Sequence, residues 1–412
     1  MKILHLSDIH LGSSFSHGKI NSETGLNTRC EDFIHSLTVC IDRAVNEPVD
    51  LVLFGGDAFP NSTPAPYLHS AFASQFKRLA QANIPTVFLV GNHDQDSQGV
   101  GVGRASLSIY HSLGVPNFIV GERLETHRIS TVSGDIQVIT LPWLTRSVLV
   151  TRKETNGLSM EQINQLLIQK VEPALLGEVR SLDPNLPTIL LGHLMAERAE
   201  IGAERYLAVG KGFQVPLALL VRPEFDYVAL GHVHKHQNLN LQNNPPVVYA
   251  GSIERVDFSE EKEEKGYVLI DIDRDRKVSW DFCVLPARPF CTIDVDVSKS
   301  ADPQAEILGA IASTDIEDAV VRLIYHLRSE QMESINIGTI NDALNIAHTY
   351  TIRANLVSQE NRRRLPELGV GNSLDPYTAL VTYLENREDI QDISDDMLKA
   401  AQNLLGEITI NH

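Results

Sequence analysis

The chain has 412 residues, and its composition, 43% hydrophobic and 21% charged, is typical of a globular protein rather than a disordered or fibrous one. Asp and Glu outnumber Lys and Arg by 53 to 35, and the formal net charge of −18 argues against a protein that holds nucleic acid through its overall charge. No apolar run reaches the roughly 18 residues of a membrane span, so we expect a cytoplasmic protein with no membrane partner.

Short β-rich runs alternate with helical patterns from residue 1 to residue 285, which predicts a layered α/β domain. The predicted strands are Lys2–Leu6, Leu51–Phe54, Thr86–Val90, Gln137–Thr140, Thr188–Leu191, Tyr227–Leu230, Val247–Tyr249 and Tyr267–Ile272. Apolar residues at helical spacing predict helices at Phe33, Leu37, Cys40 and Ala44, at Leu68, Phe72, Phe76 and Leu79, and over Ile163–Leu176. The segment Glu254–Gly266 holds six acids and three basic residues and is expected to be a solvated hairpin connection, with a functional acidic loop as the alternative.

The pattern changes near Pro286–Pro289. The strands Cys291–Val297, Ala319–His326 and Thr349–Val357, with the helices Ala305–Ala312 and Ile337–Ile346, predict a small α+β domain over residues 286–360. Two further helices, Pro376–Glu388 and Met397–Glu407, are predicted within residues 361–412. Their one-sided apolar stripes would either bind a partner or pack against the protein itself.

Five short polar clusters each follow one of the apolar strand-like runs. They are Asp8-Ile9-His10, Gly55-Gly56-Asp57, Gly91-Asn92-His93-Asp94, Gly192-His193 and Gly231-His232-Val233-His234. In an open α/β sheet, the loops beyond the carboxyl ends of the strands converge on one crevice, where ligands bind. We therefore expect the side chains of these five clusters to be neighbours in space.

The residue types of these clusters predict a metal centre. Asp, His and Asn donors without cysteine suit Mn²⁺, Mg²⁺, Fe²⁺ or Zn²⁺. The seven candidate ligands are too many for one ion and fit two ions that share a carboxylate, for which Asp57 is the natural bridge. The predicted sets are Asp8, His10, Asp57 and His234 for one ion and Asp57, Asn92, His193 and His232 for the other. Ordinary turns or core histidines would explain any one cluster, but not the ordered set of five.

Such a centre would attract an anion. Two divalent ions outweigh the carboxylates of Asp8 and Asp57 and leave a local positive charge, despite the acidic chain. A water activated by both ions would then attack phosphorus in line. His93, beside Asn92, is the expected proton donor to the leaving oxygen, with a structural hydrogen bond as the alternative. Asp94 is expected to orient a histidine ring from behind the ligands.

With these motifs the sequence resembles the calcineurin-type metallophosphoesterases and, within them, the SbcD-type nuclease subunits of SbcCD complexes, which process DNA double-strand breaks. Three further motifs carry the resemblance: Arg29-Cys30-Glu31-Asp32-Phe33, Tyr249-Ala250-Gly251-Ser252 and Asp257-Phe258-Ser259-Glu260-Glu261. The resemblance is specific over residues 1–285 and extends over residues 286–412 in layout only.

The resemblance implies a β-sandwich metallophosphoesterase core flanked by helices over residues 1–285, a DNA-selecting α+β cap over 286–360, and helices over 361–412 that bind an ATPase. The implied activity is that of an exonuclease on double-stranded DNA ends and an endonuclease on single strands or hairpins, with two Mn²⁺ ions or, as the alternative, Mg²⁺. The implied partners are an SMC-like coiled-coil ATPase of the SbcC type, DNA ends, and a second copy bound through Leu68–Leu79 and Ser106–Leu113. The implied setting is recombination, repair and replication at the nucleoid.

One position departs from the family pattern. Relatives usually carry His or Asp three residues after Asp57, where this chain has Pro60, whose side chain offers no ligand or proton. Two alternatives to a DNA nuclease remain open. A phosphoesterase for small phosphodiesters would not need the chain beyond residue 285, and a metal-binding scaffold that does not cut has Pro60 as its only support.

Overall fold

The computed structural model describes residues 1–95, 105–145, 152–200, 214–241, 244–357, 377, 380, 381, 384 and 394–410. The chain divides into two compact units that alternate along the sequence. The first comprises Met1–Val295, Gln304–Tyr325 and Asn336–Ala354, and the second comprises Asp296–Pro303, His326–Ile335 and Asn355–His412. The predicted domain boundaries at residues 285 and 360 stay predictions.

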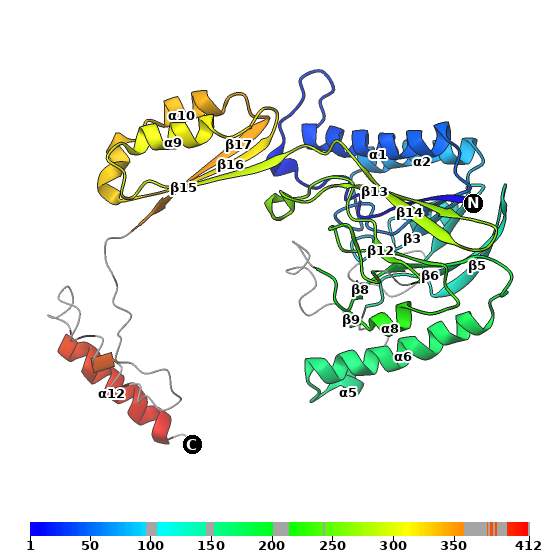
Figure 1. Cartoon of the computed structure of the whole chain (residues 1–412). Helices are drawn as coiled ribbons and strands as arrows, with labels where there is room; N and C mark the ends of the chain where they lie inside the picture. The colour runs from blue at the N-terminus through cyan, green and yellow to red at the C-terminus, as the bar shows by residue number, and fades with distance from the viewer. Residues whose placement is uncertain are drawn as a thin grey trace. The chain divides into compact units, whose positions relative to one another are not determined.

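Two six-stranded sheets form the centre of the first unit (Figure 1). The first sheet has the order β14 (Val278–Val284), β13 (Gly266–Ile272), β1 (Lys2–Leu6), β2 (Leu51–Phe54), β3 (Thr86–Leu89) and β4 (Phe118–Gly121). The second has the order β11 (Gln237–Asn238), β12 (Val247–Tyr249), β10 (Tyr227–Gly231), β7 (Thr188–His193), β6 (Gly134–Leu141) and β5 (Glu125–Thr131). All strands predicted before residue 285 are therefore present, and the predicted layered α/β fold is confirmed.

Apolar side chains from both sheets meet in a shared core between them. Val87 and Leu89 of the first sheet and Ile189 and Leu191 of the second belong to one buried cluster. The strand face on the other side of each sheet packs against helices, so the central strands are buried on both faces. This explains why they appear in the sequence as continuous apolar runs rather than as alternating ones.

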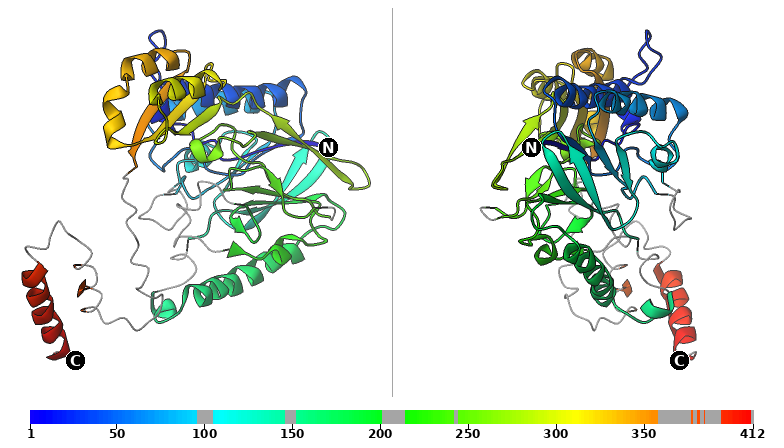
Figure 2. Two further views of the ribbon diagram at one scale, coloured as in Figure 1. Left: turned by 60° about the vertical axis from the view of Figure 1, so that its left-hand side comes forward. Right: turned by 90° about the vertical axis from the view of Figure 1, so that its right-hand side faces the viewer.

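Helices cover the outer face of each sheet (Figure 2). On the first sheet lie α1 (Thr28–Asn46) and α2 (Pro66–Gln81), whose predicted apolar stripes are buried in the core beneath them. On the second lies α6 (Met160–Arg180), which begins with a capping box between Ser159 and Gln162. The first unit is therefore a helix–sheet–sheet–helix sandwich.

The parallel strands at the centre of each sheet point their carboxyl ends in one direction. In the first sheet β1 pairs with β2 and β2 with β3 in parallel, and in the second β7 pairs with β10 in parallel. The five polar clusters lie at the carboxyl ends of these five strands, with Gly192-His193 and Gly231 forming the last residues of β7 and β10. Chain direction thus places the candidate ligands at one end of the sandwich.

A three-stranded sheet follows the sandwich in the sequence. Its order is β15 (Phe290–Asp296), β16 (Val320–Leu327) and β17 (Thr349–Leu356), and α9 (Pro303–Ala312) and α10 (Ile337–Leu344) lie on one side of it (Figure 1). The α+β pattern predicted from the sequence is present here.

The last described element is α12 (Ser394–Ile410), which contains the predicted helix Met397–Glu407. The predicted helix Pro376–Glu388 lies mostly outside the described residues. Among the residues that the structure describes, no helix is long and apolar enough to cross a membrane.

Candidate metal centre

Backbone pairing holds the first two polar clusters side by side. The ladder between β1 and β2 continues into the loops, where the amides of Asp8 and His10 donate to the carbonyls of Gly56 and Asp57, each at 3.0 Å. The amide of His232 donates to both carboxylate oxygens of Asp8 at 3.0 Å, which joins the second sheet to the first. The site is therefore built on strand ends rather than on long loops.

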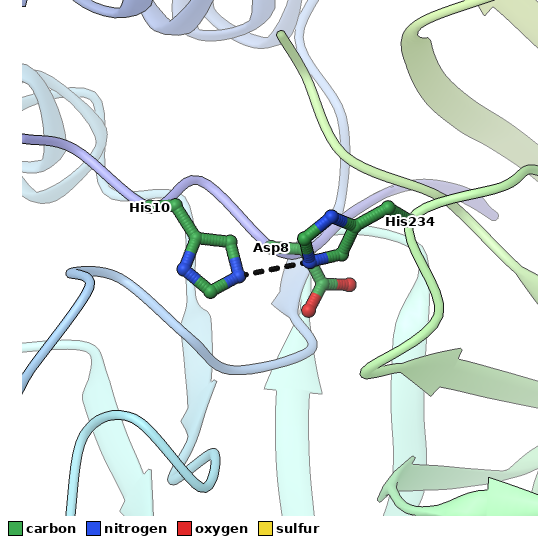
Figure 3. Close-up of side chains that lie close together, drawn as sticks. All are labelled: Asp8, His10 and His234. Atoms are coloured by element: carbon green, nitrogen blue, oxygen red, sulfur yellow. Dashed lines mark hydrogen bonds between the residues drawn. The ribbon is translucent and has the colours of Figure 1, made fainter. Parts of the chain in front are cut away.

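Asp8, His10 and His234 form the first candidate triad. Each offers one ligand atom, and these atoms lie within 4.8 Å of one another. The rings of His10 and His234 approach through their Nε2 atoms, 3.0 Å apart, beside the Asp8 carboxylate (Figure 3). His234 donates its Nδ1 proton to Glu260 at 2.7 Å, because a carboxylate can only accept. Its Nε2 is left with a lone pair directed into the triad.

Asp57, His193 and His232 form the second candidate triad, again with ligand atoms within 4.8 Å. Asp57 also lies between the two triads, since its Oδ2 is 3.4 Å from His193 Nε2 and 3.7 Å from His10 Nε2. Asn92 Oδ1 lies 3.0 Å from His193 Nε2 and 2.9 Å from His232 Nδ1. All seven predicted ligands thus meet in one place, in the grouping expected for a shared Asp57.

The surroundings of His193 show that this donor set fits a cation. Its Nδ1 donates to the Gly55 carbonyl at 2.6 Å, while its Nε2 faces oxygens of Asn92 and Asp57. A nitrogen facing two acceptors needs either a proton or a metal ion. Burial alone would lower the pKa of His193, but the charge of Asp57 and its hydrogen bond raise it to about 9. The Nδ1 of His232 also faces Asn92 Oδ1, at 2.9 Å, so two imidazole nitrogens and an amide oxygen converge here as ligands of a divalent cation do.

Two other imidazoles of the centre are held neutral. Burial, followed by the charge of His193, lowers the pKa of His232 to about 3. Burial and then the charge of His234 hold the pKa of His10 well below its ordinary value. Burial would raise the pKa of Asp57, but the charge of His193 and its hydrogen bond keep it well below the ordinary range. Neutral imidazoles and an ionised carboxylate are the protonation states that metal binding requires.

The backbone is strained at four candidate ligands. The φ angles are 50° at Asp8, 46° at His10, 58° at Asp57 and 96° at His232. Left-handed conformations of residues other than glycine cost on the order of 1–3 kcal/mol each and cluster at functional sites. Gly91 is needed for a different reason, because a Cβ there would lie 2.1 Å from Asp57 Oδ1.

His93 lies at the edge of the centre, where its ring centroid is 5.0 Å from that of His10. Its Nδ1 donates to the carbonyl of Pro60 at 2.9 Å, and its amide donates to Asp57 Oδ1 at 2.8 Å. Pro60 therefore orients His93 through its main-chain oxygen, although its side chain offers no ligand or proton.

Asp94 has a different role from the expected one. It is fully buried and accepts hydrogen bonds from the amides of Asp57 (2.8 Å), Ala58 (3.1 Å) and Gly91 (3.0 Å), and from the Ser106 hydroxyl at 3.1 Å. It therefore fixes the loop that carries Asp57 instead of orienting a histidine ring. Burial and the nearby charge of Asp57 raise the pKa of Asp94 to about 6.

The expectation of a solvated connection over Glu254–Gly266 is wrong at three positions. Glu254, Glu260 and Lys265 are at most 1% exposed. Glu254 binds the buried guanidinium of Arg29, and Glu260 binds His234. The two sequence motifs that contain Arg29 and Glu260 could have indicated this burial. The residues that they bind are distant in the chain, however, so the pairs could not be predicted.

Comparison with known proteins agrees with this geometry. The family described as calcineurin-like phosphoesterase matches residues 1–236. The SbcD nuclease of the SbcCD complex from Staphylococcus epidermidis is 28% identical over 302 residues, which is 72% of each chain. The "DNA double-strand break repair protein Mre11" of Archaeoglobus fulgidus is 23% identical over 338 residues, 78% of this chain and 67% of that one. Because the family match spans more than half of the sequence and includes both candidate triads, this chain belongs to the calcineurin-like phosphoesterase family.

Proposed function

We propose that the protein is a metal-dependent nuclease that hydrolyses phosphodiester bonds in DNA. The observation that carries the proposal is the pair of buried triads with Asp57 between them, within 4 Å of a histidine nitrogen of each. Relatives named as nucleases and as break-repair proteins support DNA as the substrate. We also propose that the protein cuts duplex ends and single strands or hairpins during recombination and repair. We expect it to be in the cytoplasm, associated with the chromosome.

The residues divide into ligands and a proton donor. Asp8, His10 and His234 would hold one divalent cation and Asn92, His193 and His232 the other, with Asp57 shared. When bound, the cations would supply positive charge for the phosphate and activation of a water. His93, whose ring donates to the Pro60 carbonyl and lies beside that of His10, would give a proton to the leaving oxygen. Donors of this kind accept both Mn²⁺ and Mg²⁺, and we propose Mn²⁺.

We further propose that residues 286–360 act as a cap that helps to select DNA and that residues 361–412 bind an SMC-like coiled-coil ATPase of the SbcC type. Within the second part, α12 carries Leu398 and Ala401 on one face, as a partner-binding helix would. A chain ending at residue 371 should keep its basal nuclease activity and lose co-purification with the ATPase. Co-purification of the shortened chain would refute this role.

The proposed homodimer needs a correction to its contact residues. Leu68, Phe72, Phe76 and Leu79 of α2 are buried in the core of their own chain and are not available to a second copy. Three large apolar side chains on or next to α2 and α3 (Ser108–Ser112) are exposed: Tyr67 at 45%, Ile109 at 49% and Leu113 at 68%. We propose these as the dimer contact.

The function is tested by offering linear duplex DNA, circular duplex DNA, a cyclic nucleotide and an aryl phosphodiester, each with Mn²⁺ or with chelator. We expect end-dependent loss of linear DNA that requires Mn²⁺ and disappears with Asp57→Asn. Hydrolysis of the small esters alone would make the protein a small-molecule phosphodiesterase. No hydrolysis of any of the four, even with the ATPase added, would indicate a scaffold that does not cut.

A further inference from the structure

Glu260 lies behind the first triad and uses both of its carboxylate oxygens. It ends the short helix η2 (Phe258–Glu260) and is fully buried. Its Oε1 accepts from His234 Nδ1 at 2.7 Å, and its Oε2 accepts from the Val256 amide at 3.0 Å and from Lys265 Nζ at 2.8 Å. The carboxylate therefore connects a candidate metal ligand to a buried cation and to the main chain.

Lys265 connects Glu260 to Glu263 and to the main chain of His234. Its buried ammonium group contacts Glu260 and Glu263, each at 2.8 Å, and donates to the main-chain carbonyl of His234 at 3.3 Å. The ammonium group of Lys265 and the amide of Val256 both donate to Oε2, which leaves Oε1 to accept from the His234 ring.

The turn that carries Glu260 is itself fixed. The Asp257 carboxylate accepts from the Ser259 amide at 2.7 Å, at the start of η2. The Phe258 ring lies 4.9 Å from the Phe290 ring, and the guanidinium of Arg322 lies 4.3 Å above it. Because these contacts fix the turn and hydrogen bonds hold both carboxylate oxygens, Glu260 has little freedom to follow a different orientation of His234.

We propose that Glu260 is a positioning residue of the metal centre, which keeps the His234 proton on Nδ1 and the Nε2 lone pair directed to the cation shared with Asp8 and His10. This inference rests on the metal centre of the proposed function, but not on the choice of substrate. Carboxylate partners of metal-binding histidines orient the ring and increase its basicity, and their loss typically weakens metal binding by about 10–100-fold.

Glu260→Gln is a sharp test because the side chains have the same shape. The two donors on the Oε2 side, from Val256 and Lys265, outnumber the single one from His234. The glutamine oxygen should therefore turn toward them and present its amide group to His234. The ring must then accept at Nδ1 and carry its proton on Nε2, which removes the lone pair from the triad.

Binding of Mn²⁺ to the metal-free full-length chain is measured by titration calorimetry. The unaltered protein should bind two ions, and Glu260→Gln should weaken one of them by about 10–100-fold while the other keeps its affinity. Glu263→Gln is the matched control, since it loses a contact with the same lysine but has none with His234, and it should bind both ions as before. In a His234→Ala background, Glu260→Gln should cause no further loss.

Three results would overturn the inference. They are unchanged binding of both ions by Glu260→Gln, an equal loss in Glu263→Gln, or a parallel loss of both ions with a lower urea midpoint of unfolding. Should Glu260→Gln not fold, Glu260→Asp keeps the charge beside Lys265, shortens the reach to His234, and should show the same selective loss. Failure of the unaltered protein to bind two ions would instead refute the proposed metal centre itself.

Discussion

Arg29→Met should destabilise the protein strongly, although Arg29 lies on a helix and contacts no metal ligand. The side chain is fully buried in α1, between the rings of Phe33 and Phe290. Its guanidinium donates to Asp32 at 2.6 Å, to Glu254 at 2.8 Å and to the carbonyl of Arg255 at 2.7 Å. Methionine fills most of the volume and removes the charge.

The size of the stability loss depends on the hydrogen-bond donors that Asp32 and Glu254 each retain without Arg29. Breaking a buried ion pair costs about 3–5 kcal/mol, because the remaining charge loses its partner without regaining water. Asp32 keeps the guanidinium of Arg288, at 2.6 Å and 2.7 Å. Glu254 keeps the amides of Arg255 and Arg288, at 3.1 Å and 3.0 Å, and the Ser36 hydroxyl at 3.5 Å, all of them uncharged donors. We therefore expect the lower end of the range, a loss of about 3 kcal/mol, carried mainly by Glu254.

The assay is urea unfolding of the metal-free protein, followed by circular dichroism. Arg43→Met is the control on the same helix, because Arg43 pairs with the exposed Glu47 and should cost less than about 1 kcal/mol. The double variant Arg29→Met/Glu254→Gln has no unpaired charge and should recover about 1 kcal/mol or more of the summed single losses. Additive losses, or an Arg29→Met protein as stable as the Arg43→Met control, would refute the reasoning.

Three further predictions concern the proton donor, a buried histidine and the thiols. His93→Ala should keep Mn²⁺ binding and lose turnover by about 100-fold or more, and loss of Mn²⁺ binding would make His93 structural instead. Burial, then the charge of His236, lowers the pKa of His5 to about 3. Just below pH 6.5 only the unfolded chain therefore takes up a proton at this residue, and the protein becomes less stable as the pH is lowered. Between pH 8 and pH 5, the free energy of unfolding in urea should therefore decrease by about 2 kcal/mol less in His5→Phe than in the unaltered protein. Equal decreases in the two proteins would contradict this. Cys30 and Cys40 are buried and unpaired, and burial raises the pKa of Cys30 to about 11, so a thiol reagent at neutral pH should label neither before urea is added; early labelling would show that this region opens.

Much of the fold could be predicted because its central strands are buried on both faces. Val87 and Leu89 face the opposite sheet while Phe88 faces the helices, so β3 appears in the sequence as a continuous apolar run. The edge strands β5 and β14 were not predicted, because they mix exposed polar residues with apolar ones and lack that signal.

The sequence by itself determined which seven side chains gather at the centre. Parallel strands bring their carboxyl ends to one edge, so a polar cluster directly after each strand is sufficient to predict neighbours. Only the tertiary structure decided what surrounds them. Glu260 and Lys265 are part of an acidic run that looks solvated, and Asp94 lies two residues after the candidate ligand Asn92. Whether such a charge is buried, and which group it binds, depends on partners brought from distant segments, since a buried charge is tolerated only where those partners satisfy it.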